Sequence, residues 1–360
     1  MHVLHVVGAR PNFMKVAPVM AALGRRLGIK QTLVHTGQHY EVKMSEIFFR
    51  QLGIAEPDVN LEVGSASHAV QTARLMDRFE PVVLDRHPDL VLVYGDVNST
   101  LAAALVCTKL FIPVGHVEAG LRSFDRRMPE EINRVLTDQI ADLLFTPSAD
   151  GDENLVHEGR PKEKVHRVGN VMIDTLVRLL PMASVANSPA VSKPYALITL
   201  HRPSNVDDPS ILKRIIEALE GISRQLPVLF PIHPRTRQRL VQCGLKVPSN
   251  GRLQVLDPVG YLEFLALQRQ ATVVITDSGG IQEETTYLGV PCLTIRESTE
   301  RPVTVTLGTN ILVGQDMDRL HAEVERILTG GPKRGQVPPL WDGKTSERIA
   351  DVIAAWGSSD

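Results

Sequence analysis

Residues 3–15 read VLHVVGARPNFMK, and this stretch decides the fold class. Residues 3–7 form a short, mostly apolar run that predicts a strand, and Gly8, Ala9 and Arg10 follow its end. A helix start comes next. Near-continuous apolar strands joined to helices are typical of a parallel sheet that is covered on both faces.

The same alternation continues along the chain in two series. Further strands are predicted at 31–35, 90–94, 113–117 and 143–146, and a second series at 195–200, 227–232, 253–256, 272–276 and 292–295. Between them lie helical stretches such as 99–110, with Asn98 or Ser99 as a natural N-cap. The pattern predicts an α/β protein with two Rossmann-like, doubly wound domains facing each other across a cleft.

A composition change marks the expected domain boundary. Residues 180–194, LPMASVANSPAVSKP, are rich in Pro, Ser and Ala and predict a linker or exposed loop. We expect a first domain at 1–175, joined by a C-terminal helix at about 345–360, and a second domain at 176–344. The Pro-rich stretch 331–340 then carries the chain back to the first domain.

Bulk properties exclude several classes of protein. A net charge of -2 gives no general attraction to nucleic acid or anionic membranes. Cys107, Cys243 and Cys292 lie far apart, which argues against a disulfide framework or zinc site and fits a reducing compartment. The N-terminus lacks signal-peptide features, and no apolar run reaches the roughly 20 residues of a membrane helix. We therefore expect a soluble, cytoplasmic protein.

Unusual polar residues follow six of the predicted strands. In open parallel sheets, ligands bind outside the carboxyl ends of the strands, so these residues predict a single site. They are Gly8-Ala9-Arg10, Gly95-Asp96, Glu118, His201-Arg202, His233 and Asp277-Ser278-Gly279-Gly280.

The first of these turns is basic. Arg10 offers a planar fork and Lys15 a mobile point charge, both suited to phosphate oxygens, although an exposed basic turn is an equal alternative. The segment GARPNFMK is neither GxGxxG nor a Walker A loop. It therefore gives no reason to expect NAD, and we expect no cofactor.

The segment TDSGGIQEE, residues 276–284, predicts an anion site. Ser278, Gly279 and Gly280 allow a tight turn into a helix whose free N–H groups and dipole face an anion. Glu284, one helical turn later, can reach towards ribose hydroxyls. The alternative is a tight turn with a solvated helix face.

Four acids fall near the ends of the first series of strands: Asp96, Glu118, Glu130 and Glu131. Carboxyl groups in a partly dehydrated cleft can exchange protons near neutral pH. Each acid alone is better explained as a helix cap or first-turn residue, since MPEEINRVLTD reads as a helix with Pro129 at N1. Together they favour catalysis.

Other kinds of site are not indicated. No cluster has zinc spacing, and no nucleophile elbow or Ser or Cys triad stands out. His39 and His116 are open between a chemical role and structural hydrogen bonding.

Nine segments of the chain form a distinctive set: VVGARPNFMK, TGQHY, YGDVNSTLA, HVEAGLRS, MPEEINR, VGNVMID, TLHRPSNVDD, TDSGGIQEE and TERP. Taken together, these motifs resemble those of the non-hydrolysing UDP-N-acetylglucosamine 2-epimerases. The resemblance covers about residues 3–315 and implies the GT-B architecture, a homodimer, and reversible conversion of UDP-GlcNAc to UDP-ManNAc without a metal or cofactor.

The resemblance also implies roles for individual residues. Asp96, Glu118 and Glu130 resemble the catalytic carboxylates, and Arg134 and His201 resemble further residues needed for activity. The remaining matches concern the nucleotide: Arg10, Lys15 and Arg301 at the phosphates, Ser278, Gly279 and Gly280 in the diphosphate loop, Glu284 at the ribose, and Phe264 near uracil.

Two segments depart from the family pattern. The stretch between Glu118 and Glu130 is shorter than in the best-known bacterial members, and Glu41 stands in a segment that helps to bind an activating UDP-GlcNAc in some of them. Activation of this chain by UDP-GlcNAc therefore stays open. So do three alternative functions: a UDP-diacetamido-glucuronic acid 2-epimerase, a GT-B glycosyltransferase and a non-catalytic UDP-sugar binding protein.

Overall fold

The computed structural model describes residues 1–37, 52–183, 194–245 and 251–358, except for the side chain of Arg10. The chain forms two compact units, one of Met1–Thr175 with Pro339–Asp360 and one of Leu176–Pro338. The division falls inside helix α7 (Val171–Leu179), ahead of the stretch expected as a linker. The chain rejoins the first unit at Pro339, before the position of about 345 that the sequence predicts.

The first unit holds a seven-stranded sheet in which every neighbouring pair is parallel, in the order β3-β2-β1-β4-β5-β6-β7. Its strands are β1 (His2–Val7), β2 (Lys30–His35), β3 (Val59–Asn60), β4 (Leu90–Tyr94), β5 (Val114–Val117), β6 (Leu143–Thr146) and β7 (Val165–Arg167). All five residues of β4 are buried, which explains its uninterrupted apolar run.

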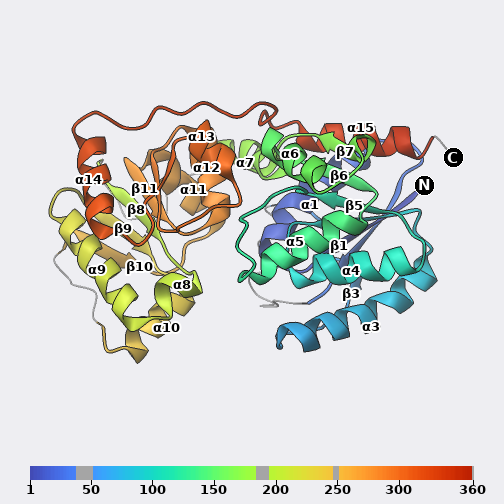
Figure 1. The fold of residues 1–360 in the computed structure, drawn as a ribbon, viewed down its shortest axis with the longest axis horizontal. Helices are drawn as coiled ribbons and strands as arrows, with labels where there is room; N and C mark the ends of the chain where they lie inside the picture. Colours follow the sequence, from blue (N-terminus) through green and yellow to red (C-terminus); the bar gives the residue numbers. More distant parts are fainter. Residues whose placement is uncertain (38–51, 184–193, 246–250, 359–360) are drawn as a thin grey trace. The chain divides into compact units, whose positions relative to one another are not determined.

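Helices cover both faces of this sheet (Figure 1). They are α1 (Arg10–Leu23), α3 (His68–Arg86), α4 (Asn98–Lys109), α5 (Pro129–Ile140), α6 (Ala149–His157) and α15 (Thr345–Trp356), with the 3₁₀ helix η1 (Lys162–Lys164). α4 packs between α3 and α5 in one layer, and α1 packs against α15. The returning segment is anchored by Trp341, whose buried Nε1 donates to the Pro147 carbonyl at 2.9 Å.

The second unit holds a six-stranded parallel sheet in the order β10-β9-β8-β11-β12-β13. Its strands are β8 (Ala196–Thr199), β9 (Val228–Pro231), β10 (Leu253–Leu256), β11 (Val273–Thr276), β12 (Cys292–Thr294) and β13 (Asn310–Leu312). Its helices are η2 (Leu180–Met182), α8 (Pro203–Val206), α9 (Pro209–Ser223), α10 (Pro234–Gln242), α11 (Tyr261–Gln270), α12 (Gly279–Leu288), α13 (Pro302–Thr306) and α14 (Met317–Leu328).

Both sheets follow the same winding rule. The first strand of each series lies between the second and the fourth, so the strand order reverses between β1 and β4 and between β8 and β11. Ligands of doubly wound sheets bind at this reversal, outside the carboxyl ends of the strands. Each unit therefore has one expected binding edge.

The prediction of an α/β fold with two doubly wound parallel sheets is confirmed, and all ten predicted strands are present. Strands β3, β7 and β13 were not predicted because each has only two or three residues and is partly exposed, whereas β12, which is as short, is fully buried and apolar enough to show. The predicted N-cap of the helix at 99–110 was wrong. Val97 caps α4, while Asn98 and Ser99 lie inside its first turn. No helix in the described segments has the length and apolar content that a membrane crossing requires.

Candidate active site

The turn after β1 is tied to the end of β4 by a buried asparagine. Asn12 Oδ1 accepts from the backbone N–H groups of Gly8 and Ala9 at 3.1 and 2.9 Å. Its Nδ2 donates to the Tyr94 carbonyl at 2.8 Å. A Cβ on Gly8 would lie 2.1 Å from Ser99 Oγ, so only glycine allows this approach. The turn therefore holds the start of α1 against the β1–β4 reversal.

A buried ion pair lies at this edge. Lys15 from α1 pairs with Glu118, which follows β5, and each side chain is 7% exposed. A Cβ on Gly95 would lie 2.7 Å from Lys15 Nζ and 3.4 Å from Glu118 Oε2, so the Gly95 backbone packs directly against the pair. The structure thus joins Lys15, predicted at a phosphate, to Glu118, predicted as a catalytic acid.

Glu118 has an unusual backbone. Its φ of 79° lies in the left-handed region, which disfavours side chains with a Cβ. The N–H groups of Glu118 and Ala119 both donate to the Phe145 carbonyl, at 3.1 and 3.0 Å, and hold this conformation. Backbone strain of this kind concentrates at functional sites, where the surrounding structure fixes it.

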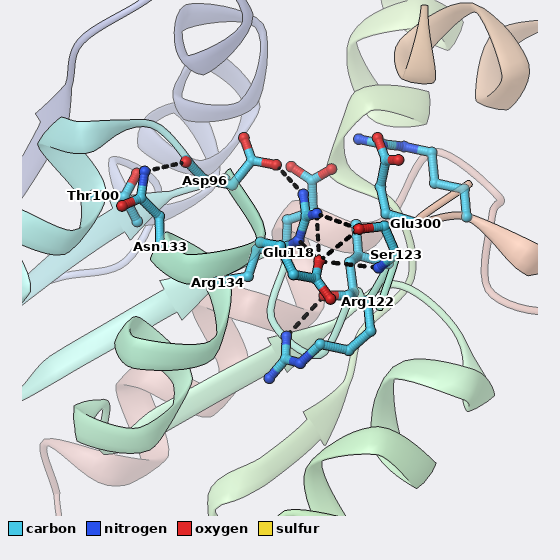
Figure 2. A network of polar contacts seen from close by, with 12 residues as sticks. Asp96, Thr100, Glu118, Arg122, Ser123, Asn133, Arg134 and Glu300 are labelled. Atoms are coloured by element: carbon cyan, nitrogen blue, oxygen red, sulfur yellow. Dashed lines mark hydrogen bonds and ion pairs between the residues drawn. The ribbon is translucent and has the colours of Figure 1, made fainter. Parts of the chain in front are cut away.

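Asp96 is held by α5. Its carboxylate pairs with Arg134, and its carbonyl accepts from Asn133 Nδ2 at 2.9 Å (Figure 2). The Asp96 side chain is 29% exposed, whereas that of Arg134 is 2% exposed. A buried cation thus orients a carboxylate that solvent still reaches.

The two glutamates at the start of α5 differ in surroundings. Glu131 is buried and accepts from the backbone N–H groups of Ser123 and Phe124 at 3.0 and 2.8 Å, and from Arg134 Nη2 at 2.6 Å. Burial acts to raise the pKa of Glu131, but the Ser123 amide and Arg134 outweigh it and hold that pKa below its usual range. Glu130 is half-buried, and no hydrogen-bond partner of its side chain is found in the described segments. Glu131 is therefore a structural anchor, and Glu130 is left available for chemistry.

In the second unit, a buried aspartate organises the edge at β8 and β11. Asp277 accepts from the backbone N–H groups of His201 and Arg202 at about 3 Å and from Asn205 Nδ2 at 3.2 Å. His201 Nδ1 also lies 3.1 Å from Asp277 Oδ1. Burial acts to raise the pKa of Asp277, but these donors outweigh it and lower that pKa. The ionised carboxylate fixes His201, whose side chain is 38% exposed.

Arg301 is held at the start of α12 by two buried acids. Its Nε lies 2.7 Å from Glu283 Oε1, and its Nη1 pairs with Glu300. Glu300 also pairs with Arg296 at 2.7 Å, and these arginines hold the pKa of Glu300 well below its usual range although burial acts to raise it. A Cβ on Gly279 would lie 2.5 Å from Arg301 Nη1. The arginine and the helix N-terminus thus present positive charge together.

Glu284 lies deeper in α12. Burial raises its pKa to about 7, against the opposing effect of the Tyr261 hydroxyl, which donates to Oε1 at 2.9 Å. Its Oε2 is buried without a hydrogen-bond partner in the described residues. Phe264, on the neighbouring helix α11, is half-buried against the apolar cluster that contains Leu267. Glu284 therefore has an acceptor that a ligand hydroxyl can fill.

The structure collects the predicted residues at the two reversals. Lys15, Asp96, Glu118 and Arg134 are joined through contacts at the first, and Glu130 lies on the same helix as Arg134. The second gathers His201, Ser278, Gly279, Gly280 and Arg301. His39 and Glu41 lie outside the described residues, as does the side chain of Arg10.

Sequence reasoning missed three acids that position other groups, Asp138, Glu283 and Glu300, and it placed Asp277 at a strand end without assigning it this role. A signal for Asp138 was present, since Glu131, Arg134 and Asp138 have the i, i+3, i+7 spacing of one helix face. In the described segments, no three His, Cys, Asp or Glu side chains group as metal ligands.

Comparison with known proteins gives consistent results. Residues 21–354 match the family model described as UDP-N-acetylglucosamine 2-epimerase. The chain is 44% identical to a Methanocaldococcus jannaschii protein of that name, over 97% of both chains. It is also 44% identical to the UDP-2,3-diacetamido-2,3-dideoxy-D-glucuronate 2-epimerase of Pseudomonas aeruginosa, over 98% of this chain and 99% of the other. The crystal structure of the M. jannaschii UDP-GlcNAc 2-epimerase with UDP-GlcNAc and UDP superposes with a TM-score of 0.90, at 43% identity over 99% of this chain and 100% of the other.

The two glycines that open α12 differ in the room around them, which gives a matched test. Gly279→Ala would force its Cβ against Arg301 and Glu300, whereas a Cβ on Gly280 meets nothing within 4 Å. We expect Gly279→Ala to lower the free energy of unfolding by about 1–3 kcal/mol. Gly280→Ala should change it little or raise it by up to about 1 kcal/mol. Urea unfolding measures both, and equal effects would contradict the packing of Arg301 on Gly279.

Proposed function

Because the chain belongs to the UDP-N-acetylglucosamine 2-epimerase family, we propose that it interconverts UDP-GlcNAc and UDP-ManNAc by inverting C2 of the sugar. The observation that carries the proposal is the carboxyl group cluster at the β1–β4 reversal, where Asp96 and Glu118 each pair with a buried cation. The nucleotide is assigned to the second unit, at the start of α12.

The reaction sets two chemical demands. The C2 hydrogen is not next to a carbonyl, so enolisation is not available. Cleavage of the bond between C1 and the phosphate oxygen leaves its electron pair on UDP, and loss of the C2 proton then forms a C1–C2 double bond. Return of a proton to the other face of C2 and of UDP to C1 gives the epimer. The intermediate is a 2-acetamidoglucal.

The first unit supplies the groups that move the proton. Asp96, Glu118 and Glu130 are the candidate acids and bases, and two of them must serve opposite faces of the sugar. A neighbouring cation favours the ionised form of a carboxylate, which is the form that removes a proton. Arg134 holds Asp96, and Lys15 holds Glu118.

Positive charge is needed where the leaving group develops negative charge. Arg301 and the N-terminus of α12 supply it in the second unit, and we assign Arg10 and Lys15 to the phosphates on the family resemblance of their motif. His201, fixed by Asp277, is a candidate donor to a phosphate oxygen. The Oε2 of Glu284, which is buried without a hydrogen-bond partner in the described residues, suits a ribose hydroxyl, and Phe264 is assigned to the uracil.

A second substrate remains a candidate. The P. aeruginosa relative acts, by its name, on UDP-2,3-diacetamido-2,3-dideoxy-D-glucuronate and is as similar to this chain as the M. jannaschii relative. Parallel assays with the two sugar nucleotides separate the possibilities by kcat/KM. A glycosyltransferase would require an acceptor, and a binding protein would show no C2 exchange. We further propose that the protein forms a homodimer.

The first experiment is proton NMR of UDP-GlcNAc with enzyme in heavy water, without acceptor. We expect UDP-ManNAc to appear with deuterium at C2, because the proton passes through acids that exchange with solvent. Asp96→Asn, Glu118→Gln and Glu130→Gln should each lower kcat by about 10²–10⁴-fold with modest effects on binding.

Asp142→Asn is the matched control. This carboxylate precedes β6, at the opposite edge of the same sheet, and pairs with Lys164 at the surface. Its change should leave turnover at the wild-type level. Wild-type turnover in all three acid variants would remove their proposed roles, and product without deuterium would contradict exchangeable acids.

The raised pKa of Glu284 predicts a pH dependence of UDP binding. Its value of about 7 means that the side chain is partly protonated near neutral pH. A ribose hydroxyl donates to the ionised carboxylate, so a protonated Glu284 must release its proton on binding. Affinity attributable to this group should rise by up to about tenfold per pH unit below pH 7 and level off above it.

Calorimetry of UDP binding from about pH 6 to about pH 8 tests this slope. Glu284→Gln removes the titrating group but retains an acceptor oxygen, so its profile reports the ionisation of the nucleotide alone. Parallel profiles for the two proteins would exclude contact between UDP and Glu284.

A further inference from the structure

His116 is fully buried in β5, and both of its ring nitrogens have partners. Nδ1 lies 2.6 Å from Asp138 Oδ1, and Nε2 lies 2.8 Å from the Gly95 carbonyl oxygen. A neutral imidazole has one N–H donor and one acceptor nitrogen. The nature of the two partners therefore determines how many protons the ring carries.

Both partners are acceptors. The Gly95 carbonyl has no proton to donate. The other carboxylate oxygen of Asp138, Oδ2, accepts from the Gly120 N–H at 3.0 Å and lies 2.7 Å from Arg122 Nη2. These two donors on Oδ2, one of them the charged Arg122, favour the ionised form of Asp138 independently of His116. Each ring nitrogen of His116 must then donate a proton.

The charges around the ring also favour a protonated His116. Arg122 bridges Asp138 and Glu158, with Nη2 2.6 Å from Glu158 Oε2. If His116 is protonated, its charge and that of Arg122 balance the charges of Asp138 and Glu158, and the group is neutral overall. With a neutral ring, the group would carry a net negative charge shared between Asp138, which is fully buried, and Glu158, whose side chain is 27% exposed. Negative charge that is buried without compensation is costly.

We propose that His116 is a buried imidazolium that acts as a positioning residue, fixing the Gly95 carbonyl and through it the turn that carries Asp96. The inference rests on the proposed function for its catalytic consequence. Its structural part, the charge state of the ring, does not depend on which substrate is used.

Gly95 links His116 to the acids. Its φ of 65° is left-handed, and its N–H donates to the Val117 carbonyl at 3.0 Å. Residues of β5 therefore hydrogen-bond both the N–H and the C=O of Gly95. The same glycine packs directly against Lys15 and Glu118, and Asp96 is the next residue in the chain. A shift at Gly95 thus moves both acids.

A second buried histidine provides an internal control. His5 in β1 pairs with the Tyr94 hydroxyl at 2.7 Å and with Gln31 Oε1 at 3.0 Å. A hydroxyl can donate or accept, so a single N–H on the ring satisfies both contacts. Burial lowers the pKa of His5 to about 4, which makes it neutral at pH 7.

The direct test is two-bond nitrogen–proton correlation NMR of the nitrogen-15-labelled, substrate-free protein at neutral pH. We expect His116 to show two protonated nitrogens and His5 to show one protonated and one unprotonated nitrogen. His116→Gln and His5→Gln assign the signals. An unprotonated nitrogen on His116 would overturn the inference.

Kinetics test the positioning role. His116→Gln loses one of the two donors and should lower kcat on the order of 10²-fold, with KM changed little, because a small displacement of a reacting group has effects of this size. His5→Gln should leave kcat near the wild-type value. An unchanged kcat in His116→Gln would also overturn the inference.

Asp138→Asn gives a second variant if His116→Gln does not fold. Its neutral amide no longer balances a charged ring, so His116 should show one protonated nitrogen and kcat should again fall. A ring that stays doubly protonated there, with unchanged kcat, contradicts the charge coupling. Failure of the wild-type protein to epimerise either sugar nucleotide would instead contradict the proposed function, while the NMR result still decides the charge state.

Discussion

One face of α5 carries the charge pairing on which the acidic edge of the first sheet depends. Arg134 binds Asp96 and Glu131, and Asp138, one turn further on, binds His116 and Arg122. Removing one member of a buried pair leaves an uncompensated charge, which typically costs about 3–5 kcal/mol. The paired side chains Glu131, Arg134 and Asp138 on this face of α5 therefore constrain one another. It places the buried Arg134 behind the carboxylate of Asp96, which is 29% exposed.

The binding edge of the second sheet also depends on buried ion pairs. There the buried carboxylates of Asp277, Glu283 and Glu300 hold two groups: Arg301, whose side chain is only 10% exposed, and His201, whose side chain is 38% exposed. A carboxylate that is held in place suits proton transfer, and a held guanidinium suits a diphosphate.

The sequence was informative where a residue's type and its place at a strand end both mattered. Near-continuous apolar runs predicted the sheets, and polar residues after them predicted the edges. The positioning acids were harder to find, because Asp138 follows no strand and its role appears only when β4, β5 and α5 come together. The left-handed backbone of Glu118 had no signal, since a non-glycine residue there is disfavoured locally and is held by Phe145 from another strand. The position of the N-cap of α4 was also lost, because Asn98 uses its side chain in tertiary contacts with Gln71.

In the mechanism we propose, the bond between C1 and the phosphate oxygen breaks and re-forms while carboxyl groups exchange the C2 proton. The most direct measurement uses UDP-GlcNAc labelled with oxygen-18 in the bridge between C1 and the β-phosphorus. We expect that, in recovered substrate, the label moves into the non-bridging oxygens of the β-phosphate during turnover, because the β-phosphate of released UDP can rotate before C1 is attacked again. Epimerisation with full exchange at C2 but with the label retained in the bridge would contradict it.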